Sequence, residues 1–136
     1  MTRVSSAVLD ASVLIRASVD RDDAAREWVA SVETGRVRGL APDLVYAEVA
    51  GALSLAARMG LVTPEEGSAL LAEAIYLQLQ ITANRLLAPA ALALSLTRAV
   101  SVYDAHYLAL AEAEGATLVT ADRRLAEATE RSVLVQ

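Results

Sequence analysis

Two acidic residues of this 136-residue chain come directly after apolar runs of the kind that form buried strands. Asp10 follows the run at residues 7–9, and Asp122 follows the run at residues 118–121. In parallel α/β sheets, ligands bind at the carboxyl ends of the strands, near the point where the strand order reverses. Both carboxylates therefore stand where a binding site is expected. Each could instead cap the helix that follows it, as aspartate often does.

Two further carboxylates stand on helix faces that should be apolar. Glu48 has apolar or small residues three and four positions away along its predicted helix, and Asp104 shares its helix face with Tyr107 and Leu108. An unpaired buried carboxylate is costly, so each of the two needs a partner or a metal ion. The structural alternatives are a buried arginine beside Glu48 and a helix-capping role for Asp104.

These four acids form a set of oxygen donors without lysine or histidine, which suits Mg²⁺ or Mn²⁺. Two carboxylates ~5 Å apart at an effective dielectric constant of ~20 repel by about 3 kcal/mol, so such a cluster is unfavourable without a cation. A metal ion held there generates hydroxide from water and stabilises the attacking and leaving oxygens of a phosphate. The pattern predicts metal-assisted phosphodiester hydrolysis by Asp10, Glu48, Asp104 and Asp122.

The elements that must position these acids alternate between strands and helices. The residue pattern predicts strands over residues 4–11, 37–41, 78–83, 116–121 and 132–136. It predicts helices over residues 12–19, 22–33, 42–59, 63–77, 89–99, 101–115 and 122–130, with Pro42, Pro64 and Pro89 at helix starts. Because no two strands are joined as a hairpin, the pattern indicates an α/β domain with a parallel sheet.

Length and composition favour one packed domain over residues 1–136. Hydrophobic residues make up 55% of the chain and charged residues 21%, with a mean hydropathy of +0.40, which is too apolar for a disordered chain. The long uncharged run at residues 86–97 is shorter than the roughly 20 residues of a membrane-spanning helix. Arg3 and Asp10 interrupt any signal-peptide core. We expect no membrane association and a cytoplasmic protein.

Several reaction classes are excluded by residue types that the chain lacks. The absence of cysteine excludes disulfide scaffolds, cysteine-ligated zinc and thiol catalysis. All 12 basic residues are arginines, so a P-loop lysine and Schiff-base chemistry are excluded. His106 is the single histidine, and we expect it to point away from Asp104 to the surface or an interface. The net charge of −5 argues against a protein that coats nucleic acid, though not against a nuclease that uses a few arginines with metal ions.

Each of the four acids lies within a longer segment: VLDASVLI (residues 8–15), LVYAEVAGAL (44–53), SVYDAHYLALAE (101–112) and LVTADRRLA (118–126). In this order and at this spacing, the segments resemble those of PIN-domain ribonucleases, specifically the VapC-type toxins of bacterial toxin–antitoxin pairs. The resemblance covers essentially the whole chain. It implies a PIN-like three-layer α/β/α domain whose five-stranded parallel sheet has the order 3-2-1-4-5.

The resemblance also implies roles for individual residues. Asp10, Glu48, Asp104 and Asp122 would be the acids that bind Mg²⁺ or Mn²⁺. Ser12 and Thr120 resemble the polar residues that support this pocket. Arg16 and Arg123 lie close in sequence to the acids, so we favour them as contacts to RNA phosphates. Members of this family cut RNA, are inhibited by a cognate antitoxin and commonly form homodimers.

The predicted helices carry more apolar residues than the core of so small a domain should need. This surplus lies around Trp28 and over residues 44–55 and 63–77. We therefore expect an exposed apolar groove that receives an antitoxin helix or strand, and a second apolar surface for a homodimer.

Two other functions are compatible with a PIN-like sequence: a non-toxin nuclease of RNA processing or decay, and a catalytically silent binding module. The presence of all four acids disfavours the silent module. A response-regulator receiver domain would need a lysine in its acidic pocket, and the chain has none. A haloacid-dehalogenase-type phosphatase would need an aspartate two residues after Asp10, where this chain has Ser12.

Overall fold

The computed structural model describes residues 4–136, and strands alternate with helices along it as predicted. The strands are β1 (Ser5–Leu9), β2 (Val37–Pro42), β3 (Gln80–Thr82), β4 (Thr117–Thr120) and β5 (Ser132–Leu134). The helices are α1 (Ala11–Ser18), α2 (Asp23–Glu33), α3 (Val45–Arg58), α4 (Pro64–Tyr76), α5 (Asn84–Arg98), α6 (Val102–Glu114) and α7 (Arg123–Glu127).

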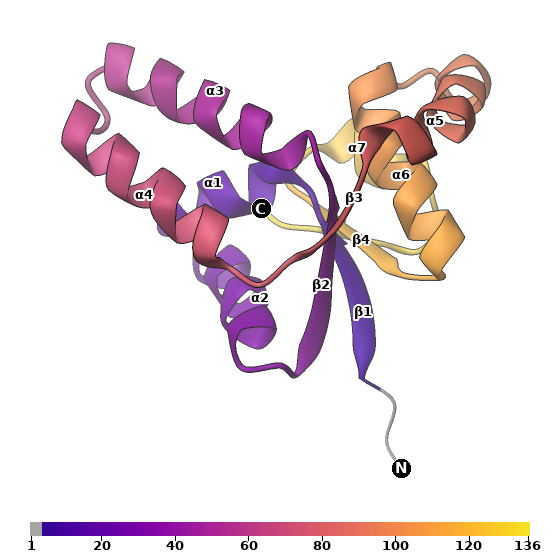
Figure 1. Cartoon of the computed structure of the whole chain (residues 1–136), viewed down its shortest axis with the longest axis horizontal. Coiled ribbons are helices and arrows are strands. Elements are labelled where there is room, and N and C mark those ends of the chain that lie inside the picture. The colour runs from indigo at the N-terminus through magenta and orange to yellow at the C-terminus, as the bar shows by residue number, and fades with distance from the viewer. Residues whose placement is uncertain (1–3) are drawn as a thin grey trace.

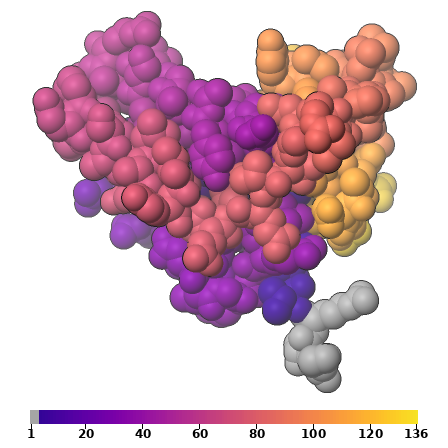
Figure 2. All heavy atoms as spheres, in the orientation of Figure 1, coloured from indigo at the N-terminus to yellow at the C-terminus, as the bar shows by residue number. Residues whose placement is uncertain are grey.

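The five strands form one parallel sheet of order β3-β2-β1-β4-β5, which confirms the predicted fold. Right-handed crossovers in such a sheet send successive connections to opposite faces once the strand order reverses. Helices α1 to α4 accordingly lie on one side of the sheet and α5 to α7 on the other (Figure 1). The all-atom view shows the chain from α4 through β3 to α5 running across the front of the molecule (Figure 2).

The order reverses between β1 and β4, the two strands that the candidate acids follow. Leu9 of β1 stands in register with Val119 of β4, and the Asp10 N–H donates to the Val119 carbonyl at 3.0 Å. The carboxyl ends of the two central strands therefore lie side by side, at the end of the sheet where a parallel α/β fold binds its ligands.

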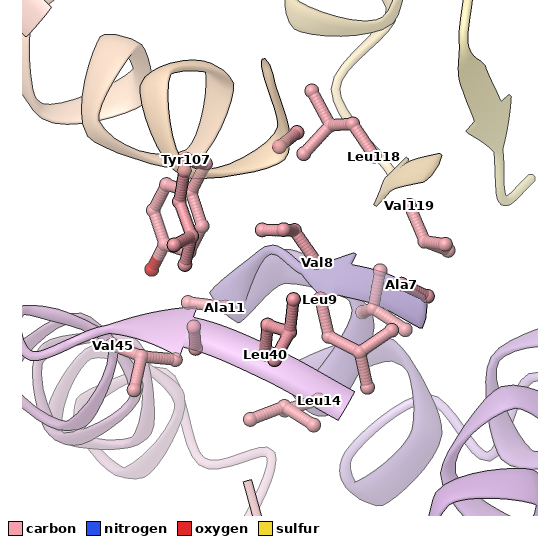
Figure 3. Close-up of a cluster of buried hydrophobic side chains, with 14 of the residues drawn as sticks. Ala7, Val8, Leu9, Ala11, Leu14, Leu40, Val45, Tyr107, Leu118 and Val119 are labelled. Atoms are coloured by element: carbon pink, nitrogen blue, oxygen red, sulfur yellow. The ribbon is translucent and has the colours of Figure 1, made fainter. Parts of the chain in front are cut away.

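The core lies between the sheet and the helices on both of its faces. Val8, Leu9, Leu118 and Val119 are fully buried, so β1 and β4 are apolar on both faces instead of alternating. Several of these side chains are drawn in Figure 3, packed between the sheet and the neighbouring helices. This double burial makes the central strands a rigid support for the residues at their ends.

The surface or interface position predicted for His106 is wrong, because the residue is buried within the domain and only 8% exposed. Helix α6 is buried on all sides over residues 105–111, where it packs against both the sheet and α5. The Nδ1 atom of His106 lies 2.6 Å from the Val102 carbonyl, a contact within its own helix. A helix buried on every face gives no polar side to which the histidine could turn.

Two predicted helix starts at prolines are also wrong. Pro42 is the last residue of β2, and the next N–H, that of Asp43, continues the ladder to the Thr82 carbonyl at 2.9 Å. Helix α5 begins at Asn84, so that Pro89 lies inside it. The turn ahead of the proline is supported by the buried Leu87 and by Asn84 Oδ1, which accepts from the Leu44 N–H at 3.1 Å.

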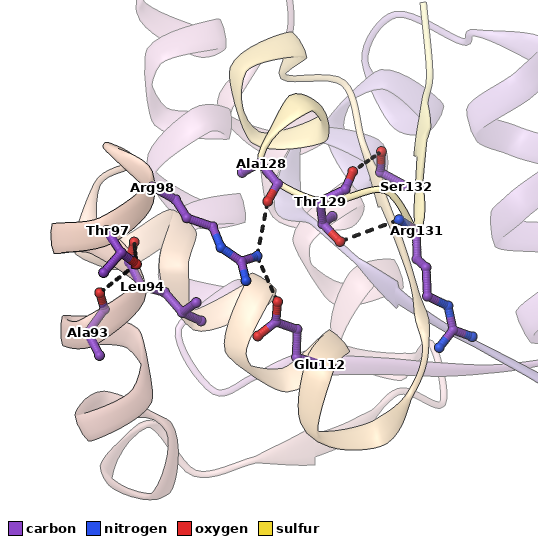
Figure 4. A network of polar contacts seen from close by, with 9 residues as sticks. All are labelled: Ala93, Leu94, Thr97, Arg98, Glu112, Ala128, Thr129, Arg131 and Ser132. Atoms are coloured by element: carbon purple, nitrogen blue, oxygen red, sulfur yellow. Dashed lines mark hydrogen bonds and ion pairs between the residues drawn. The ribbon is translucent and has the colours of Figure 1, made fainter.

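Arg98 joins three helices at the far side of the domain from the β3 edge. Its Nη1 donates to the Ala128 carbonyl at 3.0 Å and lies 2.7 Å from Glu112 Oε1, as Figure 4 shows. These contacts connect the end of α5 to α6 and to the end of α7. Within residues 4–136, no single helix has the length and apolar character needed to cross a membrane.

Candidate active site

All four predicted acids line one open pocket of about 380 Å³ at the carboxyl end of the sheet. Asp10 follows β1, Asp122 precedes α7, and Glu48 and Asp104 lie in the first turns of α3 and α6. The full lining is Asp10, Ala11, Ser12, Ile15, Arg16, Asp20, Glu48, Ala52, Asp104 and Asp122. The tertiary structure thus brings together residues that are up to 112 positions apart in the sequence.

Asp10 is the most buried of the four acids and is held by two hydroxyl groups. Its Oδ2 accepts hydrogen bonds from Ser12 Oγ at 2.7 Å and from Thr120 Oγ1 at 2.8 Å. Ser12 Oγ also accepts from the Ala121 N–H at 2.9 Å, which ties α1 to the end of β4. Asp10 stands at the N-cap position of α1 but makes no side-chain cap bond, so the capping alternative is wrong for it.

Burial raises the pKa of Asp10, and the nearby charge of Asp122 raises it further, while the hydrogen bonds from Ser12 and Thr120 lower it. Thr120 is itself fully buried beneath the pocket, and its Oγ1 also accepts from the Asp122 N–H at 3.0 Å. One hydroxyl therefore positions both of the acids that follow β1 and β4.

Asp122 does cap the helix that follows it. Its Oδ1 accepts from the Arg124 N–H at 2.9 Å and from the Leu125 N–H at 3.5 Å, and the residue is exposed. The capping alternative is therefore confirmed for Asp122. Both bonds are accepted by Oδ1, and Asp122 also lines the pocket, so capping and ligand binding are compatible.

Glu48 has a tyrosine as its partner instead of the arginine considered above. The buried Tyr107 hydroxyl donates to Glu48 Oε1 at 2.6 Å, and none of the ion pairs among residues 4–136 involves Glu48. Partial burial raises the pKa of Glu48, and repulsion by Asp10 and Asp104 adds to this, whereas the Tyr107 hydrogen bond lowers it. Burial also raises the pKa of Tyr107 far above its ordinary value, so the hydroxyl keeps its proton.

The capping alternative is wrong for Asp104, because Ser101 and not Asp104 caps α6. Ser101 Oγ accepts the hydrogen bond from the Asp104 N–H at 3.1 Å. Partial burial raises the pKa of the Asp104 carboxyl, followed by repulsion from Asp10 and Asp122. Asp104 therefore lies within the electrostatic reach of both acids at the switch point.

The donor set fits a hard divalent cation. Burial raises the pKa values of Asp10, Glu48 and Asp104, and repulsion between neighbouring carboxylates raises them further. A bound cation would relieve the repulsion between these carboxylates. Among residues 4–136, no group of three or more acidic or histidine side chains lies close enough together to hold an ion without further ligands. Mg²⁺ usually keeps several waters and binds through one or two carboxylates plus phosphates, so an open acidic pocket suits it.

The two predicted arginines lie in different places. Arg16 lines the pocket, and its Nε lies 3.7 Å from Oδ2 of Asp20, just after the end of α1, in an exposed pair. Arg123 is exposed at the first position of α7, beside Asp122 but outside the pocket lining. Sequence reasoning missed Asp20 and Tyr107 as parts of the site. For Asp20, its opposite charge four residues after Arg16 was an available signal.

The chain matches the family model described as "PIN domain" over residues 7–131. Over 87 residues it is 42% identical to "Ribonuclease VapC3" of Pyrobaculum aerophilum, a match that covers 62% of this chain and 66%, just under two thirds, of that relative.

Solved structures share the fold. The crystal structure of PAE2754 from Pyrobaculum aerophilum matches with a TM-score of 0.77 and 25% identity, covering 97% of this chain and 85% of that one. A toxin–antitoxin complex from Klebsiella pneumoniae matches with a TM-score of 0.63 and 16% identity, covering 96% of this chain and 98% of the matched chain. VapBC2 from Rickettsia felis, bound to a DNA fragment from its promoter, matches with a TM-score of 0.67 and 16% identity, covering 95% of this chain and 96% of the matched chain.

Proposed function

The chain belongs to the PIN domain family, and from this premise we propose that it is a metal-dependent endoribonuclease and the toxin of a toxin–antitoxin pair. The single observation that carries the proposal is the placement of four carboxylates around one pocket at the switch point of the sheet. The similarity to a ribonuclease of the VapC type supports RNA as the substrate.

In this proposal, Mg²⁺ or Mn²⁺ is held by Asp10, Glu48, Asp104 and Asp122. When bound, the metal supplies hydroxide at neutral pH and charge stabilisation for phosphodiester hydrolysis. Ser12 and Thr120 keep Asp10 in one orientation through the two hydrogen bonds to its Oδ2. A carboxylate whose rotamer is fixed in this way loses little entropy when it binds a ligand.

Arginines give the acidic pocket its affinity for a polyanion. Arg16 is the one basic residue in the pocket lining, and it contacts an RNA phosphate in this proposal, with Arg123 contacting a second phosphate outside the pocket. The Arg16 guanidinium can bind a phosphate through two parallel hydrogen bonds. Its exposed pair with Asp20 contributes little energy in water, so an RNA phosphate can displace that partner.

The proposal is tested by metal removal. Purified protein should cleave a structured RNA in the presence of Mg²⁺ or Mn²⁺, and EDTA should stop the cleavage because the acids alone cannot activate water. Adding back excess Mn²⁺ to the chelated sample should restore it. The readout is the pattern of RNA fragments on a denaturing gel. Cleavage that continues undiminished in EDTA would show that the metal mechanism is wrong.

The toxin role and the two alternatives are distinguished by different observations. A nuclease of RNA processing or decay would cleave RNA but would not arrest growth when expressed, and its gene would have no small antitoxin gene beside it. A silent binding module would bind RNA without cleaving it at any metal concentration. We assign the activity to the cytoplasm, where RNA is available, and to a single PIN domain.

A groove on the α1–α4 side fits the proposed antitoxin. It has a volume of about 470 Å³ and lies among α1, α2, α3 and α4, as the apolar surplus of these helices predicted. Val29, Val49, Leu70 and Leu77 are its apolar lining residues, and Trp28 is not part of the lining. Its lining also includes Arg21, Arg26, Glu33 and Glu73, which offer charged partners to a bound helix.

Filling this groove should weaken inhibition by the antitoxin without affecting RNA cleavage. Ala74→Arg places a long charged side chain in the groove, so the neighbouring-gene product should bind at least about tenfold more weakly, a loss of roughly 1.4 kcal/mol. Ala69→Arg, on the exposed face of the same helix, is the matched control. Inhibition of RNA cleavage at increasing partner concentration measures the effect. Equal inhibition of both variants would place the antitoxin elsewhere.

The proposed assembly is a homodimer, as the family resemblance implies. Leu92 and Leu96 stand one turn apart on the exposed face of α5, with Tyr103 exposed at the start of α6. Exposed apolar side chains spaced in this way are typical of interfaces. Light scattering at micromolar concentration reports the mass of the particle, and a strict monomer would contradict the dimer.

A further inference from the structure

Tyr107 is a buried side chain whose one polar atom reaches the acidic pocket. Its side chain is 0% exposed, and its hydroxyl donates to Glu48 Oε1 at 2.6 Å. Such a short distance is typical of an O–H donor facing a charged oxygen. In Figure 3 the ring of Tyr107 extends from α6 toward Ala11 and Val45, the first residues of α1 and α3.

This contact connects the two sides of the sheet at its carboxyl edge. Glu48 belongs to α3, which lies on the α1–α4 side, and Tyr107 belongs to α6, which lies on the opposite side. Tyr107 also follows Asp104 by three residues, so the two share one face of α6. One helix face therefore supplies a pocket carboxylate and the donor that orients a second one.

Two other acids of the pocket are likewise oriented by hydrogen-bond donors. Asp10 is oriented by Ser12 and Thr120, and Asp122 is oriented by backbone N–H groups of α7. Glu48 has a longer side chain than either aspartate and is only half buried, so it has more rotamers to lose on binding a ligand. The Tyr107 hydroxyl holds Oε1 and leaves Oε2 as the oxygen available to a cation.

We infer that Tyr107 is a positioning residue, which acts through Glu48 to preorganise the proposed metal site. The inference rests on the proposed function, because it concerns the same pocket. Tyr107 does not touch the metal or the RNA in this scheme. Removing its hydroxyl should weaken metal binding as the loss of an outer hydrogen-bond partner does, by roughly 10–100-fold.

The test is a Mn²⁺ titration of the melting temperature for four proteins. They are the wild type, Tyr107→Phe, Glu48→Gln and the double variant. Phenylalanine keeps the buried ring, so the core packing survives. The Mn²⁺ concentration that gives a fixed rise in melting temperature should increase roughly 10–100-fold in Tyr107→Phe. In the Glu48→Gln background, the tyrosine change should cause no further rise, because the tyrosine acts only through that carboxylate.

Tyr76→Phe is the matched control, since Tyr76 is 83% exposed at the end of α4 and lies outside the acidic pocket. It should titrate like the wild type. A purely structural role of Tyr107 would lower the metal-free melting temperature but leave the Mn²⁺ dependence unchanged, which overturns the inference alone. A further rise in the double variant also overturns it. A wild type that shows no Mn²⁺ response overturns both the inference and the proposed metal site.

Discussion

Replacing Asp10 by asparagine should reduce the rate of RNA cleavage by about 10²–10⁴-fold without unfolding the protein. A metal ion contributes several kcal/mol to such a reaction, and each 1.36 kcal/mol corresponds to a tenfold change in rate. Asp10 is 6% exposed and lies within electrostatic reach of the other three acids. Asparagine has almost the same shape but lacks the charge that would bind the cation.

The measurement is single-turnover cleavage of one RNA with excess Mn²⁺, together with a thermal melt of each protein. Asp23→Asn is the control, because Asp23 is exposed in the first turn of α2 and lies outside the pocket. The control should cleave at the wild-type rate. A variant Asp10→Asn that melts normally and cleaves within a few fold of the wild type would remove Asp10 from the proposed site.

Replacing Glu48 by glutamine should abolish RNA cleavage while leaving the metal-free protein at least as stable as the wild type. The glutamine amide oxygen can still accept the Tyr107 hydrogen bond, so the contact between α3 and α6 is kept. The charge that Asp10 and Asp104 repel is removed. The Mn²⁺-induced rise in melting temperature should shrink, because a ligand stabilises a fold only through a site that survives.

The pH dependence of this effect has a definite sign. Folding raises the pKa of Glu48 above its ordinary value of 4.5, mainly by burial, so the folded state binds the proton more tightly than the unfolded state. The metal-free wild type therefore loses stability as the pH rises from 4.5 through the raised pKa. The glutamine variant lacks this group. Its advantage in melting temperature should appear over that window and persist at neutral pH.

Thermal melts with EDTA and with excess Mn²⁺, at pH values on both sides of this window, measure the prediction. A buried ion-pair partner would behave in the opposite way, because its loss costs roughly 3–5 kcal/mol. A Glu48→Gln protein that is strongly destabilised in EDTA, and yet keeps the wild-type response to Mn²⁺, would contradict the placement of Glu48 in the metal site.

Local sequence patterns were sufficient for the parts of this protein that depend on one element at a time. Residues 7–9 are apolar on both faces of β1, which predicts a buried parallel strand and places Asp10 at its carboxyl end. Pro64 at the first helical position likewise predicted the start of α4, where Thr63 and Glu66 form a capping box. The order of the strands came from the family resemblance and not from these patterns.

Patterns failed where packing between elements outweighs local preference. Pro89 is a favourable first residue of a helix, yet α5 begins five residues earlier, where Asn84 Oδ1 accepts a hydrogen bond from the Leu44 N–H at 3.1 Å. His106 is polar, yet α6 buries it because the sheet and α5 cover that helix on all sides. Neither contact is visible in the periodicity of a single helix.

The sequence by itself identified the candidate acids, and the tertiary structure decided how each of them is held. The acids were recognisable because a carboxylate next to apolar residues is unusual within one element. The partner of Glu48 could not be recognised from the sequence, because Tyr107 lies 59 residues away and has the pattern of an ordinary core aromatic residue. Tyr107 and Glu48 come within 2.6 Å only because α3 and α6 pack on opposite faces of the same sheet. A hydrogen bond depends on distance and direction, and residue types alone do not specify either.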